Sequence, residues 1–159
     1  MRRHYGRGMP ANSVSASTTI AAPPEMVFTI LADPRQHSRI DGSGTVRQRL
    51  AGPDRLELGS RFGMSMRIGA SYRIRNTVVE YDEDRLIAWR HFAPHRWRYE
   101  LERTDDGTRG TETWDVSRCN RPTRWFLGAL GYPKVTARSI PRTLERLKAA
   151  AEADVSLIH

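Results

Sequence analysis

Cysteine is nearly absent from this chain of 159 residues, in which Cys119 stands alone. An internal disulfide is therefore excluded, and stability must come from a hydrophobic core, which a chain of this length can form. No apolar run approaches the roughly 20 residues that cross a membrane, and the N-terminal stretch lacks the apolar segment of a signal peptide. These absences predict a single soluble, cytoplasmic domain.

Lysine is also scarce, because Lys134 and Lys148 are the only two among 26 basic residues. The net charge of +8 would ordinarily indicate nucleic acid or an anionic membrane as a partner. The arginines, however, are spread along the chain on solvent-facing strand positions, and no nucleic-acid-binding motif is present. We therefore predict no specific nucleic-acid partner, whereas a transient contact with an anionic membrane stays open.

Catalytic and metal-binding signatures are missing as well. Cys119 lies in a predicted loop with no evident base, which disfavours nucleophilic catalysis. His91 and His95 are four residues apart, but Pro94 prevents the helix that would bring both rings to one face, and no further ligand cluster follows. We predict neither a metal site nor a cofactor.

The rest of the chain is organised around a predicted C-terminal helix at residues 134–154. Its apolar stripe has the spacing of an amphipathic helix and consists of Val135, Ile140, Leu144, Leu147 and Ala151. No second helix of comparable length can receive this stripe, so a sheet must cover it. Pro141 lies within the pattern and predicts either a kink near residues 137–141 or a helix that begins only at Ile140, behind a Ser139 cap.

Alternation of apolar and polar residues predicts strands through most of the remaining chain. A half-buried strand at residues 13–20 is followed by a helix that Pro23 and Pro24 introduce, and by a second short helical piece at residues 35–39. About six strands come next, with clear alternation at 61–68, 72–79 and 96–102, and the last of them at 109–117. The order predicts an α+β domain at residues 13–154, with a curved antiparallel β-sheet around a long helix. Residues 1–12 are predicted to be a disordered basic tail, in which Met9 is an alternative start.

Four phrases of the chain, taken together, resemble a known superfamily over about residues 13–152. They are VSASTTIAAPPEMVFTILADPRQH, LIAWRHF, RTDDGTRGTETWDVS and TLERLKAAAE. In this combination the chain resembles the START-like or helix-grip (SRPBCC) superfamily, in particular its polyketide cyclase/dehydrase and lipid-transport branch. The resemblance implies a curved sheet that grips the C-terminal helix, with a cavity between them for an apolar or aromatic molecule. None of the phrases is a catalytic signature.

Aromatic and thioether side chains predominate on the predicted inward faces of the strands. A partly empty cavity lined in this way suits a flat apolar ligand, although an ordinary packed core would use the same residues. With the resemblance, the predicted cavity lining is Phe62, Met64, Met66, Tyr72, Ile74, Trp89, Trp97, Tyr99, Trp114, Ile140 and Leu144.

Two strands allow two registers. In residues 86–92 we prefer Trp89 and His91 inward, because this register leaves Arg90 in water. In the last strand we slightly prefer the register that turns Trp114 inward, which carries Glu112 inward as well. The opposite registers would turn Phe92 or the threonines of the last strand inward.

Three polar residues, Asn76, His91 and Glu112, are thus predicted to share the inward surface and are weak catalytic candidates. A glutamate in an apolar pocket has a raised pKa, and a nearby histidine can transfer protons, which would permit an aldol or dehydration step. In the alternative interpretation, Asn76 satisfies a backbone group, His91 reaches the rim of the sheet and Glu112 pairs with an arginine.

The segment at residues 121–133 is too apolar for a plain connection. Trp125, Phe126 and Leu130 predict a lid over the cavity mouth, a patch that touches anionic lipid, or a helical turn packed on the sheet edge. The leading functional hypothesis is an intracellular carrier or sensor of a small hydrophobic molecule. The alternatives are a polyketide-type cyclase or dehydrase, and an interaction protein with a filled cavity and a basic surface. The sequence specifies neither the ligand nor the oligomeric state.

Overall fold

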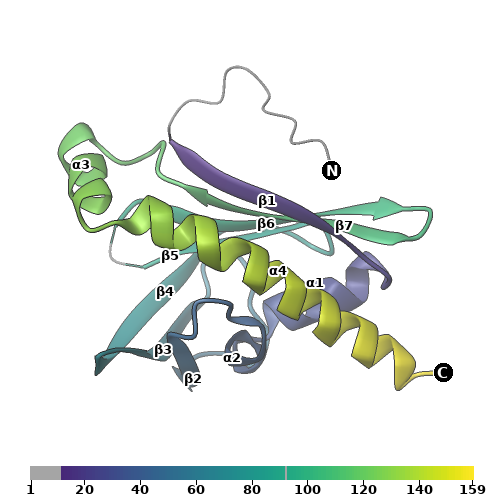
Figure 1. The fold of residues 1–159 in the computed structure, drawn as a ribbon. Coiled ribbons are helices and arrows are strands. Elements are labelled where there is room, and N and C mark those ends of the chain that lie inside the picture. Colours follow the sequence, from purple (N-terminus) through teal and green to yellow (C-terminus); the bar gives the residue numbers. More distant parts are fainter. Residues whose placement is uncertain (1–11, 92) are drawn as a thin grey trace, which may run out of the picture.

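A computed structural model of the chain describes residues 12–91 and 93–159 (Figure 1). In chain order its elements are β1 (Ser13–Ile20), α1 (Pro24–Ala32), η1 (Pro34–Gln36), α2 (His37–Ile40), β2 (Val46–Ala51), β3 (Arg61–Ile68), β4 (Ala70–Asp82), β5 (Leu86–Arg90), β6 (Arg96–Thr104), β7 (Gly107–Asp115), α3 (Arg121–Ala129) and α4 (Tyr132–Ser156). Within the described residues, seven strands form one sheet in the order β1-β7-β6-β5-β4-β3-β2, with antiparallel neighbours. The predicted α+β helix-grip class is confirmed.

The register of the sheet places distant parts of the sequence side by side. Strands β2 to β7 form a meander, and β1 returns to pair with β7, from Ser13 opposite Asp115 to Ile20 opposite Thr108. A register shift after Val78 in β4 and two shifts in the β2–β3 pair mark bulges, which bend an antiparallel sheet. The bent sheet wraps partly around α4 (Figure 1).

Helix α4 buries one stripe against β1 and β7 and against α1 and α2. Ile140, Leu144, Leu147 and Ala151 are buried as predicted, but the prediction for Val135 is wrong, because its side chain is 61% exposed. A helix turns by about 100° per residue, so the five residues from Val135 to Ile140 place the two on different faces. Thr136, which is 2% exposed, takes the inward position instead.

The helix runs through Pro141 without interruption, so the alternative start at Ile140 is wrong. A kink at this point stays a prediction. Gly42, in the loop after α2, packs directly on the next turn of α4, where its N–H donates to Thr143 Oγ1 at 3.0 Å. A Cβ at Gly42 would lie 2.3 Å from the Thr143 backbone nitrogen, so only glycine allows this approach.

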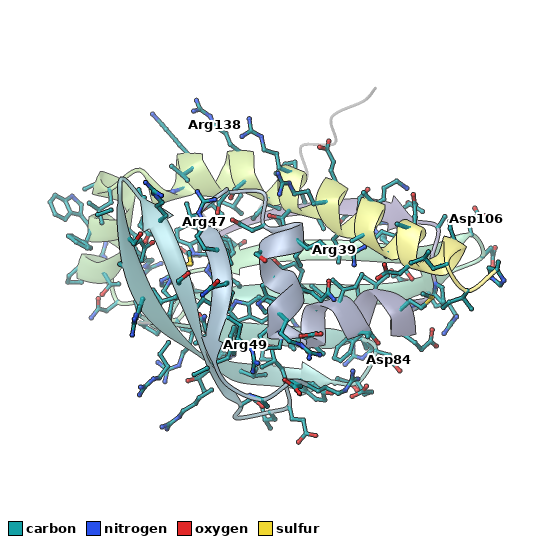
Figure 2. The ribbon with its side chains drawn as sticks, turned by 90° about the horizontal axis from the view of Figure 1, so that it is seen from below. Arg39, Arg47, Arg49, Asp84, Asp106 and Arg138 are labelled. Carbon is teal, nitrogen blue, oxygen red and sulfur yellow. The ribbon has the colours of Figure 1, made fainter. Side chains whose placement is uncertain are left out.

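A second contact between α2 and α4 is ionic. Arg39 of α2 lies between the two helices (Figure 2) and pairs with Asp154 of α4 at 2.8 Å. Its guanidinium also donates to the Ala150 carbonyl at 3.2 Å, which is near the C-terminal end of α4. Together with Gly42, this contact holds the α2 region against the gripping helix.

The predicted N-terminal tail lies outside the described residues except for Asn12. The Asn12 carbonyl accepts a hydrogen bond from the Val116 N–H at 2.8 Å, and its side chain accepts one from Arg124 at 2.6 Å. Asn12 therefore belongs to the folded domain. Of the helices in the described part of the chain, none is long and apolar enough to cross a bilayer.

Candidate functional site

The predicted lining residues come together on the face of the sheet that α1, α2 and α4 cover. Their exposure is graded along this face. The buried members are Phe62, Met64, Trp89, Tyr99, Trp114, Ile140 and Leu144. Met66, Ile74 and Trp97 are half-buried, and Tyr72, near the tip of the β3–β4 hairpin, is 40% exposed. The inner face therefore becomes accessible towards that hairpin.

Three tryptophans form a row across this face. Trp89 on β5 pairs in register with Trp97 on β6, which pairs with Trp114 on β7. Trp89 belongs to a buried cluster that includes Leu147, whereas Trp114 belongs to a second cluster that includes Ile140. The half-buried Trp97 packs against both clusters. The core is thus divided near Trp97.

Glu112 is the central polar group. The strand register places it directly opposite Tyr99, whose hydroxyl donates to Glu112 Oε1 at 2.9 Å. Burial, with a smaller contribution from the negative charge of Asp41, raises the pKa of Glu112 to about 8, although the Tyr99 hydrogen bond opposes the rise. The carboxyl group is therefore mostly protonated at pH 7. Its Oε2 atom has no hydrogen-bond partner among the described residues.

Asn76 adds a second buried oxygen on the same face. It lies on β4, is 3% exposed, and its Oδ1 atom also lacks a hydrogen-bond partner among the described residues. A buried polar atom without a partner costs about 1–3 kcal/mol, so such an atom is expected to meet water or a ligand. For Glu112 the alternative interpretation is wrong, since its hydrogen bond within the described residues comes from Tyr99 and not from an arginine.

The turn after β5 brings together two histidines that the sequence analysis kept apart. The rings of His91 and His95 lie 4.9 Å apart, in the connection between the antiparallel strands β5 and β6. His95 is fully buried, and Trp114 Nε1–H donates to its Nδ1 at 2.8 Å. The ring of Tyr132, at the start of α4, stacks on Trp114 with 6.0 Å between the ring centroids. The described residues contain no group of three or more His, Cys, Asp or Glu side chains that could hold a metal ion.

We expect His95 to remain neutral until the pH falls to about 4. Burial lowers the pKa of His95 to about 4, and burial together with the neighbouring His95 lowers that of His91 to about 4. Because His95 Nδ1 accepts from Trp114, its proton must reside on Nε2. Nitrogen-correlated NMR should show the Nε2–H tautomer at pH 7. A charged His95 ring at pH 6 would contradict this expectation.

The same shifts predict acid sensitivity of the fold. The unfolded histidines take up protons near pH 6.5 whereas the folded ones resist them, so the contribution of these two rings to stability should fall as the pH drops from about 6.5 to 4. A His95→Gln variant should flatten this part of the curve of unfolding free energy against pH. A slope identical to that of the wild type would argue against the buried neutral ring.

The segment predicted as a lid forms helix α3. Asn120 caps the helix by accepting the Thr123 N–H at 2.9 Å, and Pro122 occupies its first turn, a start signal that the sequence analysis did not use. Leu127 is buried in the cluster of Trp114. The predicted lid residues Trp125, Phe126 and Leu130 are 75%, 52% and 56% exposed. Their role as a lid stays a prediction.

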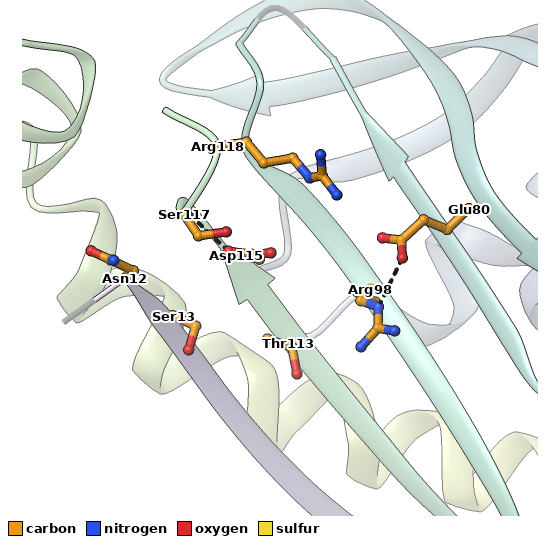
Figure 3. A pocket seen from close by; sticks show the side chains of 8 residues that line it. All are labelled: Asn12, Ser13, Glu80, Arg98, Thr113, Asp115, Ser117 and Arg118. Carbon is orange, nitrogen blue, oxygen red and sulfur yellow. Dashed lines mark hydrogen bonds and ion pairs between the residues drawn. The ribbon is translucent and has the colours of Figure 1, made fainter. Parts of the chain in front are cut away.

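A polar cleft on the opposite face of the sheet is distinct from this site. Its volume is about 340 Å³, and its lining is Asn12, Ser13, Glu80, Arg98, Thr113, Asp115, Ser117 and Arg118 (Figure 3). Thr113 and Asp115 alternate with Glu112 and Trp114 along β7, so the two sets of side chains point to opposite faces. Arg98 and Glu80 form an ion pair in this cleft at 3.3 Å.

Fold and inner face define a helix-grip protein, and comparison with known proteins gives the family. Residues 11–152 match the model of the family described as polyketide cyclase/dehydrase and lipid transport. The chain belongs to this family, as the sequence resemblance predicted.

The curated relatives do not specify a ligand. Protein Rv0088 of Mycobacterium tuberculosis strain H37Rv, described as uncharacterized, is 39% identical over 138 residues. The match covers 84% of this chain and 62% of that protein. Protein MT0096 of strain CDC 1551 is 38% identical over the same length and is also described as uncharacterized. The chain thus spans less than two thirds of the length of these relatives.

Solved structures share the fold at low sequence identity. Protein NE0264 of Nitrosomonas europaea superposes with a TM-score of 0.69 at 15% identity, over 93% of this chain and 99% of that one. The Polyketide_cyc-like protein Cgl2372 of Corynebacterium glutamicum superposes with a TM-score of 0.59 at 21% identity, over 95% and 98%. These matches support the architecture described above.

Proposed function

We propose that this protein binds a small, flat hydrophobic molecule that carries a hydrogen-bonding group. The observation that carries the proposal is the pair of buried oxygens, Glu112 Oε2 and Asn76 Oδ1, which lack partners among the described residues on a face otherwise lined by aromatic side chains. Membership of the family described as polyketide cyclase/dehydrase and lipid transport supports a hydrophobic ligand with polar substituents.

The two oxygens suit different parts of such a group. The protonated Glu112 carboxyl can donate a hydrogen bond to a carbonyl or ether oxygen, while Asn76 Oδ1 can accept one from a hydroxyl. Trp89, Trp97 and Trp114 offer aromatic faces beside them. The proposed ligand is therefore a lipid, polyketide or aromatic compound with at least one oxygen substituent.

The test is a panel of aromatic and aliphatic compounds that come in pairs with and without a hydroxyl or carbonyl group. Binding should change the fluorescence of the inner-face tryptophans and stabilise the fold by about 2.7 kcal/mol at a hundredfold excess over the dissociation constant. An Asn76→Leu variant should bind the hydroxylated member of a pair at least about tenfold more weakly and the bare hydrocarbon equally well.

The matched control is Thr113→Val, which removes a hydroxyl from the outer face of β7 and should leave both affinities unchanged. If no compound alters fluorescence or melting temperature, the inner face is closed by its own side chains. An interaction protein with a basic surface then becomes the better description.

A second candidate function is catalysis of a cyclisation or dehydration. It rests on the pKa of Glu112 near 8, because an acid that holds its proton at neutral pH can act as a general acid beside the Tyr99 hydroxyl. Glu112→Gln should then retain ligand binding and lose turnover. Equal turnover by wild type and variant would exclude this role for Glu112.

A further inference from the structure

One long segment of the chain combines positive charge with exposed apolar side chains. From Val116 to Leu144 there is no acidic residue, whereas the basic ones are Arg118, Arg121, Arg124, Lys134, Arg138 and Arg142. This segment forms α3 and the first half of α4. Its large exposed apolar residues are Trp125 (75%), Phe126 (52%), Leu130 (56%) and Val135 (61%). Exposed aromatic residues of this size are unusual on a surface that has no partner.

The tip of a second acid-free segment reaches the same end of the molecule. From Leu58 to Val79 there is again no acidic residue, and the basic ones are Arg61, Arg67, Arg73 and Arg75. The tip of the β3–β4 hairpin in this segment exposes Ile68 (64%) and Tyr72 (40%). Figures 1 and 2 both place the hairpin tip and α3 at one end of the molecule.

We propose that this end of the protein docks on the surface of an anionic lipid bilayer. The docking face consists of α3, the first turns of α4 and the tip of the β3–β4 hairpin. Its aromatic and aliphatic side chains would enter the boundary between headgroups and acyl chains, while the surrounding cations contact the headgroups. Arg138 extends from α4 away from the body of the protein (Figure 2), as a headgroup contact requires.

Charge complementarity selects the membrane over a second copy of the chain. A symmetric dimer through this face would bring the cations of both copies together without any acidic residue of either segment to offset them. A bilayer rich in anionic lipid supplies negative charge and an apolar layer in one surface. The cations and the exposed apolar side chains of the docking face would then both have partners in the bilayer.

The docking face also includes part of the inner face. Met66 and Ile74 are half-buried on the β3–β4 hairpin, and Tyr72, which lies opposite Met66 in register, is 40% exposed near its tip. A hydrophobic ligand could pass between bilayer and inner face without crossing water. Vesicle binding is measured without the small ligand, so its result is independent of the ligand-binding test. The protein can bind ligand without binding vesicles, or bind vesicles without binding ligand.

The test is co-sedimentation of the full chain with phosphatidylcholine vesicles that contain either no phosphatidylglycerol or about one third of it. We expect strong partition only into the anionic vesicles, with a fall as salt increases. Trp125→Ser/Phe126→Ser should weaken partition at least about tenfold. The matched control is Leu58→Ser, because Leu58 is 66% exposed but precedes the opposite end of β3, and it should partition as the wild type does.

A second pair of variants tests charge with equal loss of cations. Arg121→Gln/Lys134→Gln should reduce partition, whereas Arg109→Gln/Arg146→Gln, with both cations outside the docking face, should reduce it much less. Circular dichroism of each variant checks that the fold is retained. Partition that is equal for neutral and anionic vesicles, or unchanged by the Trp125/Phe126 substitutions, would overturn the proposal. A dimer in solution that the same substitutions dissociate, without vesicle binding, would overturn it in favour of self-association.

Discussion

Replacing Glu112 by glutamine should make the folded protein increasingly more stable than the wild type as the pH rises from about 4.5 to about 8. The pKa of the folded carboxyl is raised to about 8 by burial, whereas the unfolded group ionises near its ordinary pKa of 4.5. Between these values the folded state holds a proton that the unfolded state has released, so the contribution of this carboxyl to wild-type stability falls with rising pH, opposite in sign to that of the buried histidines below pH 6.5. Glutamine carries no ionisable proton and can still accept the Tyr99 hydrogen bond.

The expected change in unfolding free energy is large for a single side chain. The difference between the folded and unfolded pKa corresponds to about 5 kcal/mol at about 1.4 kcal/mol per pH unit, fully developed only above pH 8. Urea unfolding of both proteins at pH 5, 6.5 and 8.5 measures it. Parallel curves of unfolding free energy against pH for the two proteins would contradict the burial of a neutral carboxyl.

A companion variant separates the hydrogen bond from burial. The Tyr99 hydroxyl lowers the pKa of Glu112 by stabilising its charged form, so Tyr99→Phe should raise that pKa further. The loss of stability with pH should then extend to higher pH than in the wild type. A shift of the titration to lower pH would show that the hydroxyl stabilises the protonated form instead.

Truncating Leu147 to alanine should destabilise the fold by about 2–5 kcal/mol, the range for removing a fully buried leucine side chain. Leu147 is 0% exposed at the middle of the α4 stripe, where it packs in the cluster that includes Phe28, Phe62 and Trp89. The cavity left behind would remove contacts to both the helix and the sheet. Unfolding of both proteins in guanidinium chloride at the same pH, pH 6, measures the change in unfolding free energy.

Val135→Ala is the control for the same helix. Val135 is 61% exposed, so its truncation should change stability by less than about 0.5 kcal/mol, the usual range at exposed positions. The contrast tests the orientation of α4 directly. Equal losses from the two variants would mean that α4 presents a different face to the sheet.

The predictions that succeeded rest on local spacing. Alternation along β7 indicated that Trp114 and Glu112 share the inward face, and both are buried. The α4 pattern indicated the inward positions of Ile140 and Leu144 for the same reason, since side-chain direction follows from the repeat of the backbone. Val135 was misplaced because an apolar residue was assumed to be inward where Thr136, one residue later, has the correct phase.

The features that the sequence patterns left unresolved lie in a connection between two strands and at the start of a helix. The rings of His91 and His95, which lie between β5 and β6, are 4.9 Å apart, and no periodic pattern predicts this contact. Helix α3 was left open among three interpretations, and its two aromatic residues, Trp125 and Phe126, are exposed while Leu127 is buried. Its capping residue Asn120 was the available signal.

By itself, the sequence determined the class of this protein: an antiparallel sheet that wraps a C-terminal helix, with aromatic residues and one carboxyl on the inner face. Those properties follow from the spacing of apolar and polar residues along short stretches of the chain, which can be read without knowing the fold. Tertiary structure alone decided the chemistry of the site. Glu112 holds its proton because burial removes water around it, and the strand register places Tyr99 opposite it, 13 residues away in sequence. Desolvation and pairing across strands are properties of the assembled fold, because they depend on which distant segments exclude water from each other.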